Sequence, residues 1–73
     1  MARVVVLGES LAVAGFALGG ATTMSADDPE AVRRSWDALP GDTAVVVLTA
    51  AAADALGPRT DERPGVLTVT MPT

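Results

Sequence analysis

The sequence contains no cysteine and no histidine, and it also lacks lysine. Without cysteine the chain forms no disulfide and offers no thiolate nucleophile, and zinc and copper lose their usual ligands when histidine is missing too. Histidine is also the most frequent general base near neutral pH. We therefore expect no catalytic residues, no metal site and no bound cofactor.

Positive charge is scarce. The chain has five cationic residues against nine acidic ones, which gives a formal net charge of −4. A nucleic-acid surface needs clustered cations that neutralise phosphates, so this balance argues against nucleic acid as a partner, and we expect none. The cations are all arginines, namely Arg3, Arg33, Arg34, Arg59 and Arg63.

Aromatic residues are limited to Phe16 and Trp36, although hydrophobic residues make up 49% of the chain. A chain of 73 residues forms one domain at most, spanning residues 1–73. Domains of this size bury only about 60% of the surface that their unfolded chains expose. We expect a marginally stable domain that gains stability by docking onto a larger partner.

Three apolar, β-branched runs predict strands, at residues 3–7, 43–48 and 66–71. The first two runs are apolar at consecutive positions, which is typical of parallel strands that are covered on both faces. A fourth and weaker strand is predicted over residues 21–25.

Segments with helical spacing separate these strands. Ser10 is a candidate N-cap for the first helix, which Gly19 and Gly20 would end. Asp28 is a candidate N-cap for the second helix, with Pro29 at its first position. One face of this second helix carries Ala31, Val32, Ser35, Trp36 and Leu39.

The third helix is predicted over residues 50–56, with Thr49 as its N-cap and Gly57 and Pro58 as its end. Residues 59–64 are charged and predict a solvated loop. Strands that alternate with helices indicate an α/β fold with a small four-stranded parallel sheet. Right-handed crossovers with one reversal of direction favour the flavodoxin-like or receiver-like order 2-1-3-4.

The N-terminal segment, with Arg3 followed by an apolar stretch and small residues up to Ala26, loosely imitates a secretory signal. Glu9 lies inside the apolar stretch, where a charge is costly to bury in lipid. Removal of this segment would also leave too little chain for a core without disulfides. We expect neither a signal peptide nor direct membrane insertion.

Gly8 follows the first strand, where a dinucleotide-binding domain carries its glycine-rich turn. Here Leu11 and Val13 stand where small residues are needed, and Glu9 would repel a phosphate. A phosphate-accepting receiver domain would need an aspartate at the end of the third strand, where this chain has Thr49. A nucleotide-binding enzyme fragment is therefore a disfavoured alternative.

Two further features each have a structural and a functional interpretation. Asp27, Asp28 and Glu30 lie close together and carry the oxygen ligands that suit a hard cation, but the start of a helix explains them. Trp36 has the spacing of a core residue, and tryptophan is also favoured as an anchor at protein interfaces.

The order of these motifs resembles the F subunits of the V-type (A/V-type) ATP synthases. The similarity runs along nearly the whole chain, from a strand followed by a glycine and an acidic residue to a last strand that follows one proline and ends at another. Its residues are Gly8, Gly15, Phe16, Leu18, Gly20, Pro64 and Pro72. The chain departs from the family pattern in having Ala17 in place of an arginine and Glu9 in place of an aspartate, and in lacking the C-terminal helix after Thr73.

The resemblance implies a non-catalytic central-stalk, or rotor, subunit of a rotary ATPase. Such a protein docks on the coiled-coil shaft, which the D subunits of these complexes form. It takes part in coupling ATP synthesis or hydrolysis to hydrogen-ion or sodium transport, while the nucleotide sites lie on other subunits. It is cytoplasmic and peripheral to the membrane through the complex. Phe16 and Trp36 are the candidate partner contacts. The alternative is a stand-alone α/β protein-binding or regulatory module without catalysis.

Overall fold

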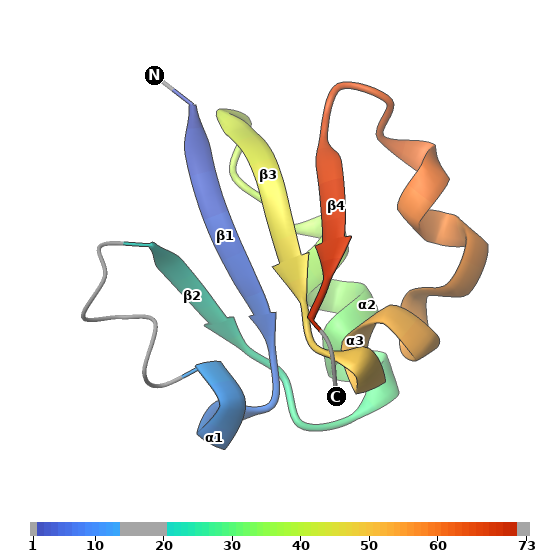
Figure 1. The fold of residues 1–73 in the computed structure, drawn as a ribbon. Coiled ribbons are helices and arrows are strands. Elements are labelled where there is room, and N and C mark those ends of the chain that lie inside the picture. The colour runs from blue at the N-terminus through green and yellow to red at the C-terminus, as the bar shows by residue number, and fades with distance from the viewer. Residues whose placement is uncertain (1, 14–20, 72–73) are drawn as a thin grey trace.

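The computed structural model describes residues 2–13 and 21–71. In chain order its elements are β1 (Arg3–Gly8), α1 (Ser10–Val13), β2 (Thr22–Ser25), α2 (Pro29–Asp37), β3 (Thr43–Leu48), α3 (Ala50–Leu56), the 3-10 helix η2 (Gly57–Glu62) and β4 (Leu67–Thr70) (Figure 1). This alternation confirms the α/β class that the sequence predicts.

The four strands form one sheet in the order β2-β1-β3-β4, and every neighbouring pair is parallel (Figure 1). The predicted flavodoxin-like order is therefore confirmed, with β1 and β3 at the centre. No helix follows β4 in the part of the chain that the structure describes, up to residue 71.

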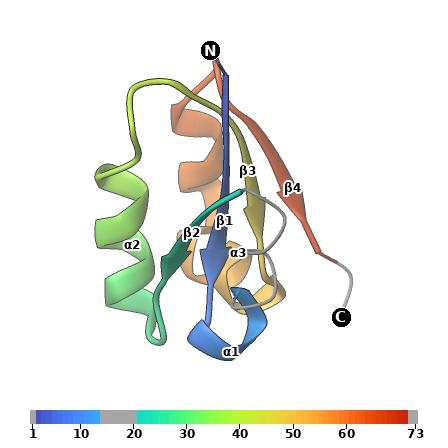
Figure 2. The ribbon, with the colours of Figure 1, turned by 90° about the vertical axis from the view of Figure 1, so that its left-hand side faces the viewer.

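Helices α2 and α3 cover the same face of the sheet (Figure 2). Alternate residues of the central strands point into this layer, because successive side chains of a strand point to opposite faces. From β1 and β3 these residues are Val5, Leu7, Val46 and Leu48, and at most 1% of the surface of each is exposed. They pack with the helix residues in one hydrophobic core.

Both longer helices begin as the sequence predicts. The Asp28 carboxylate accepts a hydrogen bond from the Ala31 backbone N–H at 2.7 Å, and Pro29 is the first residue of α2. The Thr49 hydroxyl accepts from the Ala52 N–H at 3.2 Å at the start of α3. These side chains satisfy backbone donors that would otherwise lack a partner at a helix start.

Two local predictions are wrong. Ser10 is the first residue of α1 rather than its cap, and its hydroxyl donates to Asp27 instead of accepting from the helix. Residues 57–62 form a 3-10 helix, part of which was predicted to be a loop. In a 3-10 helix residues i and i+3 lie over one another, and here the Arg59 side chain donates to Glu62 at 3.1 Å.

Within the described residues, no helix combines the length and the apolar character that a bilayer crossing needs.

Candidate functional site

Three loops meet at the carboxyl edge of the sheet, after β1, β2 and β3 (Figure 1). In open α/β sheets, ligands bind at this edge where the strand order reverses, which here is between β1 and β3. The loops contribute Glu9 after β1, Asp27 and Asp28 after β2, and Thr49 after β3. A ligand site is therefore expected at this edge of the sheet, if the chain has one.

The crevice between β1 and β3 is filled by Thr49. A Cβ atom added at Gly8 would lie 2.2 Å from the Thr49 Cγ2 atom, so the end of β1 and the residue after β3 approach each other as closely as a glycine allows. The Thr49 hydroxyl also donates to the Glu9 carboxylate, and only 6% of the Thr49 surface is exposed. A phosphate therefore finds no open glycine-rich turn at this position.

Asp27 joins the loop after β2 to the start of α1. Its carboxylate accepts from the Ser10 backbone N–H at 2.9 Å and from the Ser10 hydroxyl at 2.8 Å. These two hydrogen bonds stabilise the charged form and hold the pKa of Asp27 below the ordinary aspartate value. The start of α2 therefore explains Asp28, its N-cap, and Glu30 in its first turn, whereas Asp27 links the loop after β2 to the start of α1.

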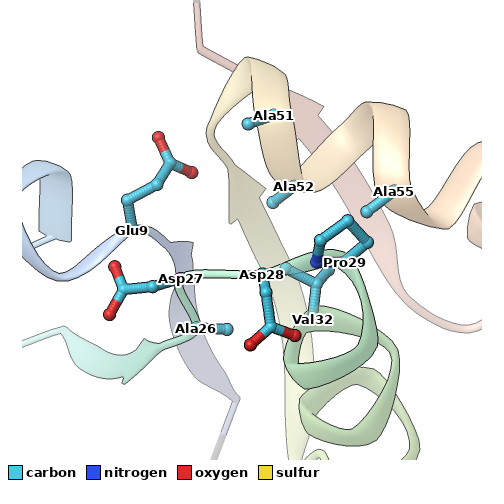
Figure 3. A pocket seen from close by; sticks show the side chains of 9 residues that line it. All are labelled: Glu9, Ala26, Asp27, Asp28, Pro29, Val32, Ala51, Ala52 and Ala55. Atoms are coloured by element: carbon cyan, nitrogen blue, oxygen red, sulfur yellow. The ribbon is translucent and has the colours of Figure 1, made fainter.

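A shallow pocket of about 70 Å³ lies beside these loops, between the first turns of α2 and α3 (Figure 3). Sites for small molecules and cofactors usually measure at least about 300 Å³, so this pocket is too small for a nucleotide. Its lining consists of Glu9, Ala26, Asp27, Asp28, Pro29, Val32, Ala51, Ala52 and Ala55.

The acidic side chains at the pocket do not converge. The carboxylates of Glu9, Asp27 and Asp28 point in different directions (Figure 3), and each accepts a hydrogen bond from the protein. In residues 2–13 and 21–71, no group of three or more acidic side chains is placed to hold a metal ion. The absence of cofactors and catalysis remains a prediction, which calorimetry with ATP and magnesium would test.

We expect the Ser10–Asp27 contact to make folding stability dependent on pH in the acidic range. Because the pKa of Asp27 is lower in the folded chain than in the unfolded chain, its contribution is complete above the unfolded value. It disappears as the pH falls through the folded value. Thermal melting of the wild type and of Asp27→Asn at several pH values checks this: the two melting temperatures should differ near neutrality and converge at low pH. A constant difference would contradict it.

Trp36 is one of the two predicted partner contacts, and the structure places it in the core. Its side chain is 1% exposed and packs with the buried residues of the sheet. The guanidinium carbon of Arg63 lies 5.6 Å from the ring centroid, in a cation–π arrangement that helps to cover it. In this conformation Trp36 is a core residue with almost no surface open to a partner, and its role as a partner contact stays a prediction.

The other predicted contact, Phe16, lies outside the described residues, as do Gly15, Leu18, Gly20 and Pro72 of the family pattern. Of the remaining pattern residues, Gly8 is buried against Thr49, whereas Pro64 lies before β4 and is exposed. Gly8 and Pro64 are the two residues of the family pattern that the structure describes, and they do not lie together in one site.

The face of the sheet opposite α2 and α3 is apolar and partly uncovered along β1, β3 and β4. The strand registers align its side chains in two rows across β1, β3 and β4. The rows are Val4–Val45–Leu67 and Val6–Val47–Val69. Val6 is buried, but 42% of Val4, 62% of Leu67 and 45% of Val69 is exposed. In the described part of the chain, these three are the exposed large hydrophobic residues.

This arrangement corrects in part the prediction that both faces are covered along the central strands, because Val6 is buried on this face whereas Val4 is exposed. Val45 and Val47 are only half-buried, because α2 and α3 both lie on the other face. Sequence reasoning missed Leu67 and Val69 as candidate contacts. The alternation in Leu67-Thr68-Val69-Thr70 was an available signal, since it separates an apolar face from a polar one.

Comparison with known proteins finds no family model that matches the chain and no curated protein with significant similarity to it.

Proposed function

We propose that this chain is a non-catalytic binding subunit that docks on a larger protein through the apolar face formed by Val4, Val45, Val47, Leu67 and Val69. The observation that carries the proposal is that the three exposed large hydrophobic side chains all lie on this one face. An apolar sheet face is stable when another element covers it. Contiguous apolar surface of this kind marks interaction sites on soluble domains.

The chemistry of the face favours an apolar helical partner. Its exposed and half-buried residues are valine and leucine, without charge or hydrogen-bonding side chains. On the opposite face of the same sheet, the partners are the helices α2 and α3. A helix of another protein with an apolar stripe would repeat that packing.

More specifically, we propose that the partner is the coiled-coil shaft of a V-type or A-type rotary ATPase. The chain would then be a central-stalk subunit on the cytoplasmic side of the membrane and would turn with the rotor. The resemblance described above motivates this form, and the apolar face supports it by giving a helical shaft a place to dock. A stand-alone regulatory module that binds a different helical protein is the alternative.

Substitution of the exposed face tests the docking. We expect Leu67→Asp to abolish complex formation with the shaft protein, because the charge would be buried against an apolar surface. Ala51→Asp is the matched control, since Ala51 is exposed on α3, on the covered side of the sheet. Co-expression followed by gel filtration measures both variants.

The wild-type chain should also gain thermal stability from its partner. Binding to the native state stabilises by about 2.7 kcal/mol when the free partner is at about 100 times Kd, and such a shift is large for a small domain. Moderate salt should change the affinity little, because the face carries no charge. A complex that Leu67→Asp leaves intact, or that dissociates in moderate salt, would contradict docking through this face. If the wild type forms no complex with the shaft protein, the proposal that its partner is the shaft of a rotary ATPase is wrong.

A further inference from the structure

Strand β4 forms one edge of the sheet, because its partner in the described part of the chain is β3 alone. We propose that two copies of this chain pair through β4, in antiparallel orientation, about a twofold axis perpendicular to the sheet. This inference concerns the backbone edge of β4 and not the apolar face, so it does not rest on the proposed function.

The register of β4 shows which backbone groups are free to pair. The Met71 N–H donates to the Leu48 carbonyl oxygen at 2.8 Å, so the backbone of Met71 faces β3. Backbone groups of successive residues point to alternate sides of a strand. The N–H and C=O groups of Thr68 and Thr70 therefore point outward, away from β3.

The twofold axis restricts the register of the pair. On neighbouring strands of one sheet, side chains that lie directly opposite each other point to the same face of the sheet. A twofold axis perpendicular to the sheet maps each face onto itself, so the two copies place the same residues on the same face. Thr68 can therefore lie opposite Thr70 or Thr68 of the second copy, or Thr70 can lie opposite itself. The last register sets Thr68 against position 72, which is a proline and has no backbone N–H to exchange. Pairing Thr68 with Thr70 uses both outward residues of each copy, and it places Val69 opposite itself at the axis.

The register with Thr68 opposite itself is also less favourable. With Thr68 opposite itself, Thr70 would pair with Val66 of the second copy, but the Val66 N–H already donates to the Arg63 carbonyl at 3.0 Å. The register with Val69 at the axis has two hydrogen-bonded pairs, each exchanging two bonds. It joins two four-stranded sheets into one of eight strands, a size that natural sheets reach.

The composition of β4 favours a copy of itself as the partner. Sheet edges are usually protected from pairing by lysine, other charges, proline or a bulge. Residues 64–73 contain no charged residue, and residues 67–70 contain no proline. Two copies therefore meet without like-charge repulsion at this edge, although each carries a net charge of −4. Cross-strand threonine pairs and a valine pair are favourable neighbours in an antiparallel ladder.

Proline at the outward position tests the pairing. The Thr68 N–H is not used within the sheet, so Thr68→Pro removes an outward donor and leaves the ladder to β3 intact. We expect it to weaken the dimer about 30-fold, because two backbone hydrogen bonds are lost per dimer. Sedimentation over a range of concentrations measures the dissociation, and circular dichroism checks that the variant is folded. Thr70→Pro removes the other outward backbone donor. It replaces Thr68→Pro in this measurement if Thr68→Pro does not fold.

A single cysteine tests the register independently. The chain has no cysteine, so Val69→Cys carries the sole thiol. Opposite residues of a non-hydrogen-bonded antiparallel pair have Cα atoms about 4.5 Å apart, within disulfide range. We expect mild oxidation to link Val69→Cys into a dimer, while Val4→Cys, equally exposed on β1, stays unlinked.

Several results would overturn the proposal. These are a wild-type chain that remains monomeric at all concentrations, open-ended assemblies in place of dimers, and equal cross-linking of Val4→Cys. A dimer that is unchanged by both proline variants would also overturn it. The proposed function is tested by a different measurement, complex formation by Leu67→Asp, so the two can fail separately.

Discussion

Replacement of Val46 by aspartate is expected to unfold the chain. Val46 lies in the middle of β3, is completely buried, and faces the layer between the sheet and the helices α2 and α3. An unpaired carboxylate at such a position costs several kcal/mol. At about 0.05–0.15 kcal/mol per residue, a chain of this length has a total stability of roughly 4–11 kcal/mol. The substitution therefore removes most or all of the stability.

Val45→Asp is the matched control, because it places the same charge one residue earlier on the same strand. Val45 points to the opposite face, is half-buried, and lies between the exposed residues Val4 and Leu67. Its carboxylate can reach water, so we expect a loss of only about 1 kcal/mol. Urea unfolding followed by circular dichroism compares the variants. Equal losses for Val45→Asp and Val46→Asp would contradict the assignment of the two faces.

This contrast between neighbouring valines also shows what the sequence could and could not predict. The apolar run from Val45 to Leu48 predicts a buried strand, and the structure confirms the strand. When every residue of a run is apolar, however, the period of two disappears, and the pattern no longer separates the two faces. Which face is covered depends on where α2 and α3 pack. That position follows from the topology of the whole chain, and the sequence of the strand does not reveal it.

Helix ends were predictable where the interaction is local. Asp28 and Thr49 each bond a backbone N–H three residues later, so sequence spacing alone identifies them. Ser10 is also a residue type that caps helices, but it donates to Asp27, 17 positions away. No local pattern distinguishes these cases, because it is the pairing of β1 with β2 that brings Ser10 and Asp27 together.

The closed crevice between β1 and β3 likewise depends on a contact between distant residues. The sequence places a glycine after the first strand and a threonine after the third, and each was interpretable by itself as a turn and a cap. Only the parallel pairing of β1 with β3 brings Gly8 and Thr49 together. Gly8 is therefore explained by the close approach of a side chain, with no need for a phosphate.

Gly8→Ala is expected to destabilise the chain by about 1–3 kcal/mol, the usual cost of forcing extra volume into a packed site. The added Cβ would lie 2.2 Å from Thr49 Cγ2 and 2.6 Å from Thr49 Oγ1, so the threonine must move. Movement would weaken the cap of α3 and the hydrogen bond to Glu9 together. Gly41→Ala is the matched control, since nothing lies within 4 Å of a Cβ built at Gly41. That variant should change stability by less than about 0.5 kcal/mol.

Thr49→Ala should rescue Gly8→Ala. Alone, Thr49→Ala loses the cap and costs about 1 kcal/mol. In the double variant the two atoms nearest to the new Cβ are gone, and the nearest remaining atom is the Cβ of residue 49 at 2.9 Å, so a small shift relieves this contact. We therefore expect the double variant to be more stable than the sum of the two single losses predicts, by about 1–2 kcal/mol. Thermal and urea unfolding of all four proteins complete the cycle. Strictly additive losses would show that the contact with Thr49 is not the reason for the glycine.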